Sequence, residues 1–159
     1  MSEDIKNSSD IELYNMLRTD KKTARIAFDE LYLRYSKRIY TYCRKILNNV
    51  VLADDVFQEV FLQLHQVGKA GQDIKNISGF LITMARNRCL NENMRIANTF
   101  STLDDVEISY SDDLLEREEL KKIVNLSIDA LPDQYKEVII MKEHMDMSYN
   151  EIATALNLS

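Results

Sequence analysis

Arginine and asparagine side chains are concentrated in the middle of the chain, within residues 86–95. These candidates for contact with nucleic acid are Arg86, Asn87, Arg88, Asn91 and Asn93. Guanidinium and amide groups donate hydrogen bonds to phosphates and to the exposed edges of unpaired bases. The segment therefore predicts a surface for nucleic acid, and some of these side chains are expected to have structural roles instead.

A second group of polar side chains lies within residues 52–65, on one side of an expected helix. Asp55, Gln58, Glu59 and Gln63 fall opposite or beside the apolar stripe of that helix, where they are free to pair with a basic partner. An ordinary solvated helix face carries the same residue types. The pattern alone leaves both interpretations open.

The residue types that support catalysis or metal binding do not form a recognisable set. There is no phosphate-binding glycine loop, and the carboxylates are scattered without a partner pattern. Cys43, Cys89, His65 and His144 lack the spacing of a zinc site, and the two cysteines lie in apolar helical patterns typical of reduced core thiols. We therefore expect no enzymatic activity, no cofactor and no metal.

The elements that position these residues are predicted to be helices. The chain has 3 Gly and 1 Pro in 159 residues, and no sustained alternation of apolar and polar residues. No stretch approaches the roughly 18 apolar residues that a membrane helix needs, and the polar, acidic start is unlike a secretory signal. We expect an all-α protein that resides in the cytoplasm and does not insert into a membrane.

The apolar periodicity divides the first part of the chain into helices. A short helix is expected over 10–18, followed by a long one with a stripe of nine residues: Phe28, Leu31, Tyr32, Tyr35, Ile39, Tyr42, Cys43, Ile46 and Leu47. The third helix has its buried face at Ala53, Val56, Phe57, Val60, Phe61, Leu64 and Val67. Gly68 and Gly71 are expected to stop it, and Ser78 to cap a fourth helix over about 79–96. These helices predict one bundle, residues 10–97.

The remainder of the chain predicts a linker and a second, smaller helical domain. Residues 98–119 read as an acidic linker, and helical periodicity resumes over 120–159. Pro132 fits a helix start, and the next helix is expected to bury Tyr135, Val138, Ile139 and Met145. Ser148 and Glu151 have the capping-box spacing before Ile152, Ala153 and Leu156. Residues 157–159 then read as the turn of a helix-turn-helix.

Charge is unevenly distributed despite the net charge of −6. Residues 16–50 hold nine Lys or Arg against three acids, and residues 80–97 hold three Arg against one Glu. Residues 104–119 hold eight acids (Asp104, Asp105, Glu107, Asp112, Asp113, Glu116, Glu118 and Glu119) against Arg117. The basic charge thus lies on the first bundle, where phosphates could bind, and the acidic charge lies in the linker.

Three segments in the same order resemble extracytoplasmic-function sigma factors of bacteria. LADDVFQEVFLQLH (52–65) resembles the family's polymerase-docking helix, and ISGFLITMARNRCLNENMR (77–95) resembles its promoter-melting helix. Residues 131–159 resemble the start of its C-terminal domain, up to the turn of the helix-turn-helix. The resemblance implies a non-enzymatic initiation factor, and the recognition helix of this domain would be expected to follow Ser159.

The resemblance also assigns roles to residues. Core RNA polymerase would be bound by Asp54, Asp55, Gln58, Glu59, Phe61 and Gln63. Promoter DNA, on the non-template strand of the melted region, would be bound by Lys75, Asn76, Phe80, Arg86, Asn87, Arg88, Asn91 and Asn93. Phe80 stands where the family commonly has Trp, so packing inside the bundle is an equal alternative for it.

The implied partners are core polymerase, promoter DNA and an anti-sigma factor. The alternative is a helical interaction protein that competes for polymerase without binding DNA. It would retain the surface of residues 53–64 and lose the DNA contacts.

Overall fold

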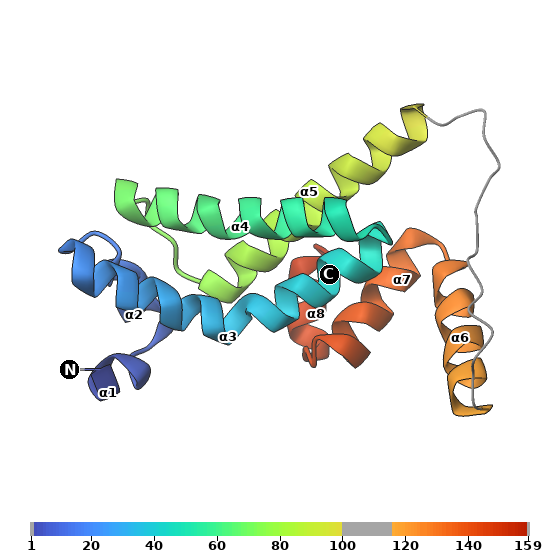
Figure 1. Cartoon of the computed structure of the whole chain (residues 1–159), viewed down its shortest axis with the longest axis horizontal. Helices are drawn as coiled ribbons and strands as arrows, with labels where there is room; N and C mark the ends of the chain where they lie inside the picture. The colour runs from blue at the N-terminus through green and yellow to red at the C-terminus, as the bar shows by residue number, and fades with distance from the viewer. Residues whose placement is uncertain (1, 100–115, 159) are drawn as a thin grey trace.

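The computed structural model describes residues 2–99 and 116–158, in which all regular elements are helical (Figure 1). The elements are α1 (Ser2–Lys6), α2 (Asp10–Met16), α3 (Lys21–Leu47), α4 (Val50–Ala70), α5 (Ile77–Thr99), α6 (Glu116–Asp129), α7 (Asp133–Ile139), the π-helical turn η1 (Ile140–His144) and α8 (Tyr149–Ala155). The prediction of an all-α fold is confirmed. Most of the predicted acidic linker lies outside the described residues. No helix in the described part is long and apolar enough to cross a membrane.

Helices α3, α4 and α5 pack together and form the bundle on which the rest of the structure is built (Figure 1). The predicted face of α4 is buried at Ala53, Val56, Val60, Phe61, Leu64 and Val67, with Phe57 half-buried beside them. On α3 the predicted stripe is buried at Leu31 and from Ile39 onward, Phe28 and Tyr35 are half-buried, and Tyr32 is 41% exposed. Cys43 and Cys89 are free and fully buried in this core, as predicted.

Gly68 does not end α4, which continues to Ala70. The helix ends instead at Gly71, whose φ of 75° is the left-handed conformation that glycine adopts without strain. Gly68 is buried against α2, and a Cβ placed on it would lie 2.5 Å from Leu17 Cδ1 and 3.1 Å from Leu17 Cβ. The glycine therefore permits close approach of α4 to the end of α2.

Helix α5 begins at Ile77, two residues before the predicted start, because Asn76 and not Ser78 caps it. The side chain of Asn76 accepts a hydrogen bond from the backbone N–H of Gly79 at 2.9 Å, and its carbonyl accepts from Phe80 at 3.0 Å. The cap satisfies backbone donors that have no partner inside the helix. It also fixes where the α4–α5 loop ends and where the polar side chains of α5 begin.

The C-terminal helices differ from the prediction in what they bury. Helix α6 begins at Glu116 rather than Leu120, and α7 follows Pro132 as expected. Tyr135, predicted to be buried, is 56% exposed, whereas Lys136 and Glu137 are buried. The capping box of α8 is confirmed, because Ser148 and Glu151 each accept a hydrogen bond from the backbone N–H of the other at 2.7–3.1 Å.

The C-terminal helices share a continuous core with the bundle. Their buried apolar residues Ile140, Met141, Met145, Met147 and Ile152 belong to the same cluster as the bundle core. Within the described ranges, η1 contacts α3 and α8 contacts α5. The C-terminal helices are therefore packed on the bundle through apolar side chains.

A buried carboxylate adds a polar connection between these two parts. The Glu137 side chain on α7 is 3% exposed and accepts hydrogen bonds from Tyr42 on α3 at 3.0 Å and from Arg86 Nε on α5 at 3.1 Å. Burial, and then the negative charge of Glu137, raise the pKa of Tyr42 well above its usual range. The hydroxyl therefore stays protonated and remains a donor to the carboxylate. We call Tyr42, Arg86 and Glu137 the Glu137 network.

We predict that Gly68→Ala lowers the free energy of unfolding. Overpacking against the buried Leu17 costs ~1–3 kcal/mol, and the gain in helix propensity offsets ~1 kcal/mol of it. The net loss of about 1 kcal/mol should appear in urea denaturation followed by circular dichroism. The control is Lys69→Ala at the exposed neighbouring position. Equal or higher stability of Gly68→Ala would contradict the close approach of α2 and α4.

We also predict that Arg86→Ala destabilises the fold more than Arg88→Ala. The first change leaves the Glu137 carboxylate buried with Tyr42 as its remaining network partner, at a cost of roughly 2–4 kcal/mol. The second removes an ion pair to Glu59 whose two side chains are 36% and 54% exposed, at a cost below about 1 kcal/mol. Urea denaturation of the two variants gives the comparison. Similar losses for both would contradict the Glu137 network.

Candidate functional site

Four residues of α4 form an exposed surface on the side of the helix opposite its buried stripe. Leu62, which is 56% exposed, lies with Asp55, Gln58 and Glu59 around a shallow depression. The spacing of these residues by three or four positions places them on one face of the helix. An exposed leucine among acids and an amide is suited to a partner with basic groups and an apolar contact. We call these residues the α4 surface.

The other predicted polymerase contacts are less accessible. Asp54 and Gln63 are half-buried at the borders of the helix face. Phe61 is 3% exposed and packs edge-on against Tyr32, with ring centroids 4.9 Å apart. Its ring centroid also lies 5.1 Å from that of Phe57. Phe61 has a role in the core, and it offers a partner almost no surface.

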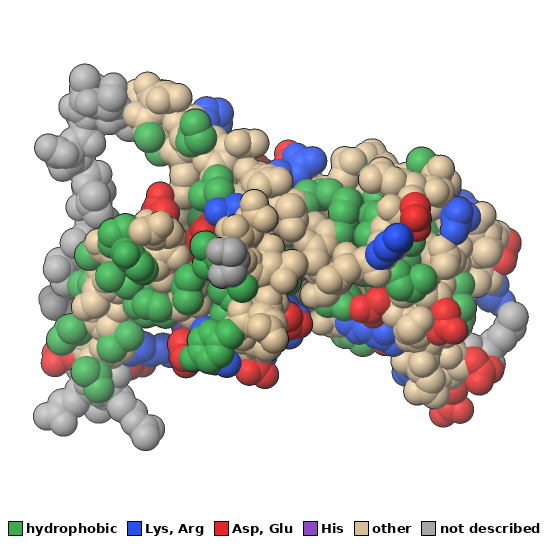
Figure 2. Space-filling model, turned by 180° about the vertical axis from the view of Figure 1, so that it is seen from behind, with side chains coloured by type: hydrophobic (Ala, Val, Ile, Leu, Met, Phe, Trp, Pro, Cys, Tyr) green, Lys and Arg blue, Asp and Glu red, His purple; other side chains and the backbone are tan. Residues whose placement is uncertain are grey.

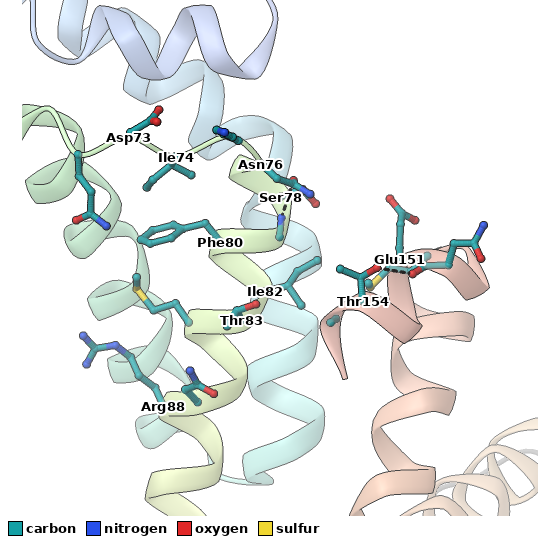
Figure 3. Close-up of a pocket in the computed structure, with 18 of the residues that line it drawn as sticks. Asp73, Ile74, Asn76, Ser78, Phe80, Ile82, Thr83, Arg88, Glu151 and Thr154 are labelled. Carbon is teal, nitrogen blue, oxygen red and sulfur yellow. Dashed lines mark hydrogen bonds between the residues drawn. The ribbon is translucent and has the colours of Figure 1, made fainter. Parts of the chain in front are cut away.

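A cavity of about 990 Å³ lies beside α5 and gathers most of the predicted DNA-binding residues (Figure 3). Predicted residues that line it are Lys75, Asn76, Phe80, Asn87, Arg88 and Asn91. Thr83 and Met84 complete the same stripe of α5, and the α4–α5 loop forms one end. Helix α8 contributes Asn150, Glu151 and Thr154 to the lining. In Figure 3, Thr154 lies near Ile82 of α5, while Phe80 and Arg88 lie on the other side of that helix.

Arg86 and Asn93 are not on this cavity. They lie on the sides of α5 that face α3 and the C-terminal helices. Arg86 is held by Glu137 in the network described above, and Asn93 donates a 3.4 Å hydrogen bond to the Ile46 carbonyl of α3. The polar residues of this segment therefore lie on two sides of α5. One side lines the cavity, and the residues of the other side contact α3 and α7.

One ion pair connects the α4 surface with the cavity stripe. Arg88 Nη1 lies 2.6 Å from Glu59 Oε2, and both side chains remain partly exposed. Exposed pairs of this kind are weak and are screened by salt. Glu59 and Arg88 can therefore exchange this contact for contacts with partners.

The cavity has the chemistry of a binding site for single-stranded nucleic acid. Asn87, Asn91 and Asn150 offer amide donors and acceptors, Arg88 offers a charged donor, and Phe80 offers a half-buried aromatic face. Within the described ranges, no group of three or more His, Cys, Asp or Glu side chains is placed to hold a metal ion.

Sequence reasoning missed Thr83, Met84, Glu137 and the α8 residues of the cavity. It placed Tyr42 in the apolar stripe but did not foresee its hydrogen bond to Glu137. Thr83 and Met84 lie three and four positions after Phe80, so helical spacing could have identified them. Glu137 and Tyr42 are 95 residues apart, and the linker, α6, α7 and η1 separate α8 from α5 along the chain. Local periodicity carries no signal for such contacts.

Residues 31–97 match sigma-70 region 2, which spans most of α3, all of α4 and nearly all of α5. The chain is 22% identical over 138 residues to the ECF RNA polymerase sigma factor SigM of Bacillus subtilis strain 168, covering 84% of each chain.

Two further relatives have similar names. The ECF RNA polymerase sigma factor SigW of the same organism is 28% identical over 155 residues, covering 87% of this chain and 81% of that protein. The RNA polymerase sigma-H factor of Pseudomonas aeruginosa is 26% identical over 147 residues, covering 82% and 75%. Residues 31–97 are thus similar to sigma-70 region 2, within a chain that is distantly similar, at 22–28% identity, to sigma factors of two bacteria.

Proposed function

We propose that this protein is a sigma factor that binds bacterial core RNA polymerase and directs the recognition and melting of specific promoters. The region 2 domain and the sigma factor relatives support this role in transcription initiation. The observation that carries the proposal is that α4 and α5, both inside that domain, expose two adjacent surfaces of different chemistry. The role requires no catalytic group.

The α4 surface is the proposed contact with polymerase. Its acids and exposed Leu62 are complementary to a basic partner helix with an apolar contact point. Asp54 and Gln63 would border the contact, and the buried Phe61 would support the helix from inside. An apolar residue surrounded by polar groups is the usual anatomy of a protein interface.

The cavity stripe of α5 is the proposed contact with the non-template strand of the melted promoter. Captured bases would stack on Phe80 and hydrogen-bond with Asn87, Asn91 and Arg88. Lys75 and Asn76, at the loop end of the cavity, would meet a base turned out of the duplex. The free energy of these contacts would offset the cost of unpairing, so the protein opens DNA through binding alone.

The proposal includes a site of action and a regulatory partner. A factor that works on core polymerase acts in the cytoplasm. The kinship with extracytoplasmic-function sigma factors also suggests an anti-sigma partner.

We expect the double variant Asp55→Lys/Leu62→Ser to lose co-purification with bacterial core RNA polymerase. The change reverses a charge and removes the exposed apolar group of the α4 surface, and neither residue is buried. Loss of a central apolar contact and of charge complementarity is expected to weaken binding at least about 100-fold. The measurement is pull-down of purified core enzyme by the tagged full chain.

The matched control is Glu3→Lys, a charge reversal on α1, which lies on the other side of α3 from α4 in Figure 1. It should bind core enzyme as the native chain does. Failure of the native chain to bind would overturn the sigma factor role. Binding by the double variant would move the polymerase contact away from the α4 surface.

The second candidate is a competitor that binds polymerase without binding DNA. The ion pair between Arg86 and Glu137 favours it, because a residue expected to meet DNA already has an anionic partner within the protein. The variant Asn87→Ala/Arg88→Ala distinguishes the two functions, since it should retain polymerase binding. If the protein initiates transcription at promoters, the variant should form at least about 10-fold fewer open complexes than the native chain, as measured by permanganate footprinting. A competitor would form no open complexes in either form.

A further inference from the structure

We propose that the C-terminal helices α7, η1 and α8 compete within the same molecule with nucleic acid for α5. In this closed state the Glu137 carboxylate takes the place on Arg86 that a nucleic-acid phosphate would otherwise occupy. The inference rests on the proposed DNA contact of α5 and adds to it a state in which that contact is blocked.

The chemistry of the Glu137 network supports the substitution of a phosphate by a carboxylate. Arg86 Nε lies 3.1 Å and 3.2 Å from the two carboxylate oxygens, so one donor is shared between both. Both phosphates and carboxylates are anionic oxygen acceptors that guanidinium groups bind. The Arg86 side chain is still 28% exposed, so the pair with Glu137 does not remove it from solvent.

The position of α8 supports competition at the cavity as well. Asn150, Glu151 and Thr154 line the same cavity as Asn87 and Asn91 of α5. Figure 3 shows Glu151 and Thr154 beside α5, on the side of that helix where Ile82 lies. Glu151 adds an exposed carboxylate to the lining, which would repel the phosphates of an approaching strand. A strand bound along the whole of α5 would therefore have to displace α8 or move away from it.

The closed state is held by contacts that can be exchanged. Ile152 of α8 and Met147 before it are buried, and the polar contact of α7 with the bundle is one carboxylate with donors from two bundle helices. Leaving this carboxylate without Arg86 inside the closed state is costly, because a buried charge needs partners. On release, Glu137 would be solvated and Arg86 would be free for phosphate, so neither group would remain unpaired.

The α6 helix shows that part of the C-terminal segment is uncovered in this state. Leu120, Ile123, Val124 and Leu126 are 43–64% exposed, and hydrophobic side chains are visible over α6 at the left edge of Figure 2. Within the described ranges α6 contacts α7. The helices that pack on α5 thus follow directly after a helix, α6, whose apolar side chains are exposed.

The test is binding of a fluorescein-labelled single-stranded DNA of about ten nucleotides, a length within the usual range for such sites. We expect Glu137→Gln, in the full chain without polymerase, to bind this DNA at least about 5-fold more tightly than the native chain. The reason is that only molecules whose C-terminal helices are released from α5 bind the DNA, so the apparent dissociation constant falls as the fraction of such molecules rises. Salt is held constant, because phosphate contacts depend strongly on it.

The matched control is Glu143→Gln, which removes an exposed carboxylate from η1 with the same change in net charge. It should bind DNA as the native chain does. Tyr42→Phe is a milder second variant, because it removes one donor to Glu137 without changing the net charge. It should change binding in the same direction by a smaller factor. Circular dichroism checks that each variant is folded.

Hydrogen exchange of the α8 amides gives an independent measure of release. Faster exchange together with tighter DNA binding in Glu137→Gln would support the inference. Faster exchange without tighter DNA binding would overturn the competition. Co-purification with polymerase depends on α4, so it would show separately whether the sigma factor role also fails. Unchanged exchange and unchanged binding would overturn the role of Glu137.

Discussion

The carboxylate of Glu137 determines how the two parts of this protein sit together. It is almost completely buried and receives hydrogen bonds from α3 and α5, the two bundle helices that also contact the C-terminal helices. Apolar packing brings these helices to the bundle, but it is non-directional, and a buried charge tolerates few arrangements. The network therefore adds a directional contact to the apolar packing in the arrangement where α8 lines the cavity beside α5.

The polar residues of α5 differ in function because a helix has several faces. Neighbours in sequence are separated by about 100° around the axis, so Arg86 and Asn87 point in different directions. Asn87, Arg88 and Asn91 reach the cavity, whereas Arg86 reaches Glu137. Both candidate functions are compatible with the residues of this helix. They differ in whether its polar faces are open to DNA or occupied by contacts within the protein.

Sequence patterns predicted the bundle well where apolar spacing was strict, as on α4, whose buried face matches the expected stripe. They were wrong where close packing or a cap decided the outcome: Gly68 continues the helix because Leu17 lies against it, and Asn76 caps α5 in place of Ser78. In α7 they placed Tyr135 inside and gave no sign that Glu137 is buried. The partners that stabilise a charge there are 51 and 95 residues away, beyond the reach of local periodicity.

The order of these residues along the chain has a consequence during synthesis. Arg86 is made 51 residues before Glu137, an interval of roughly 3–10 s at ordinary rates of translation. In that interval the bundle can fold with α5 uncovered, since its own core comes from α3, α4 and α5, and Arg86 lies near the surface. A nascent chain would thus expose the whole of α5 before the helices that cover it leave the ribosome.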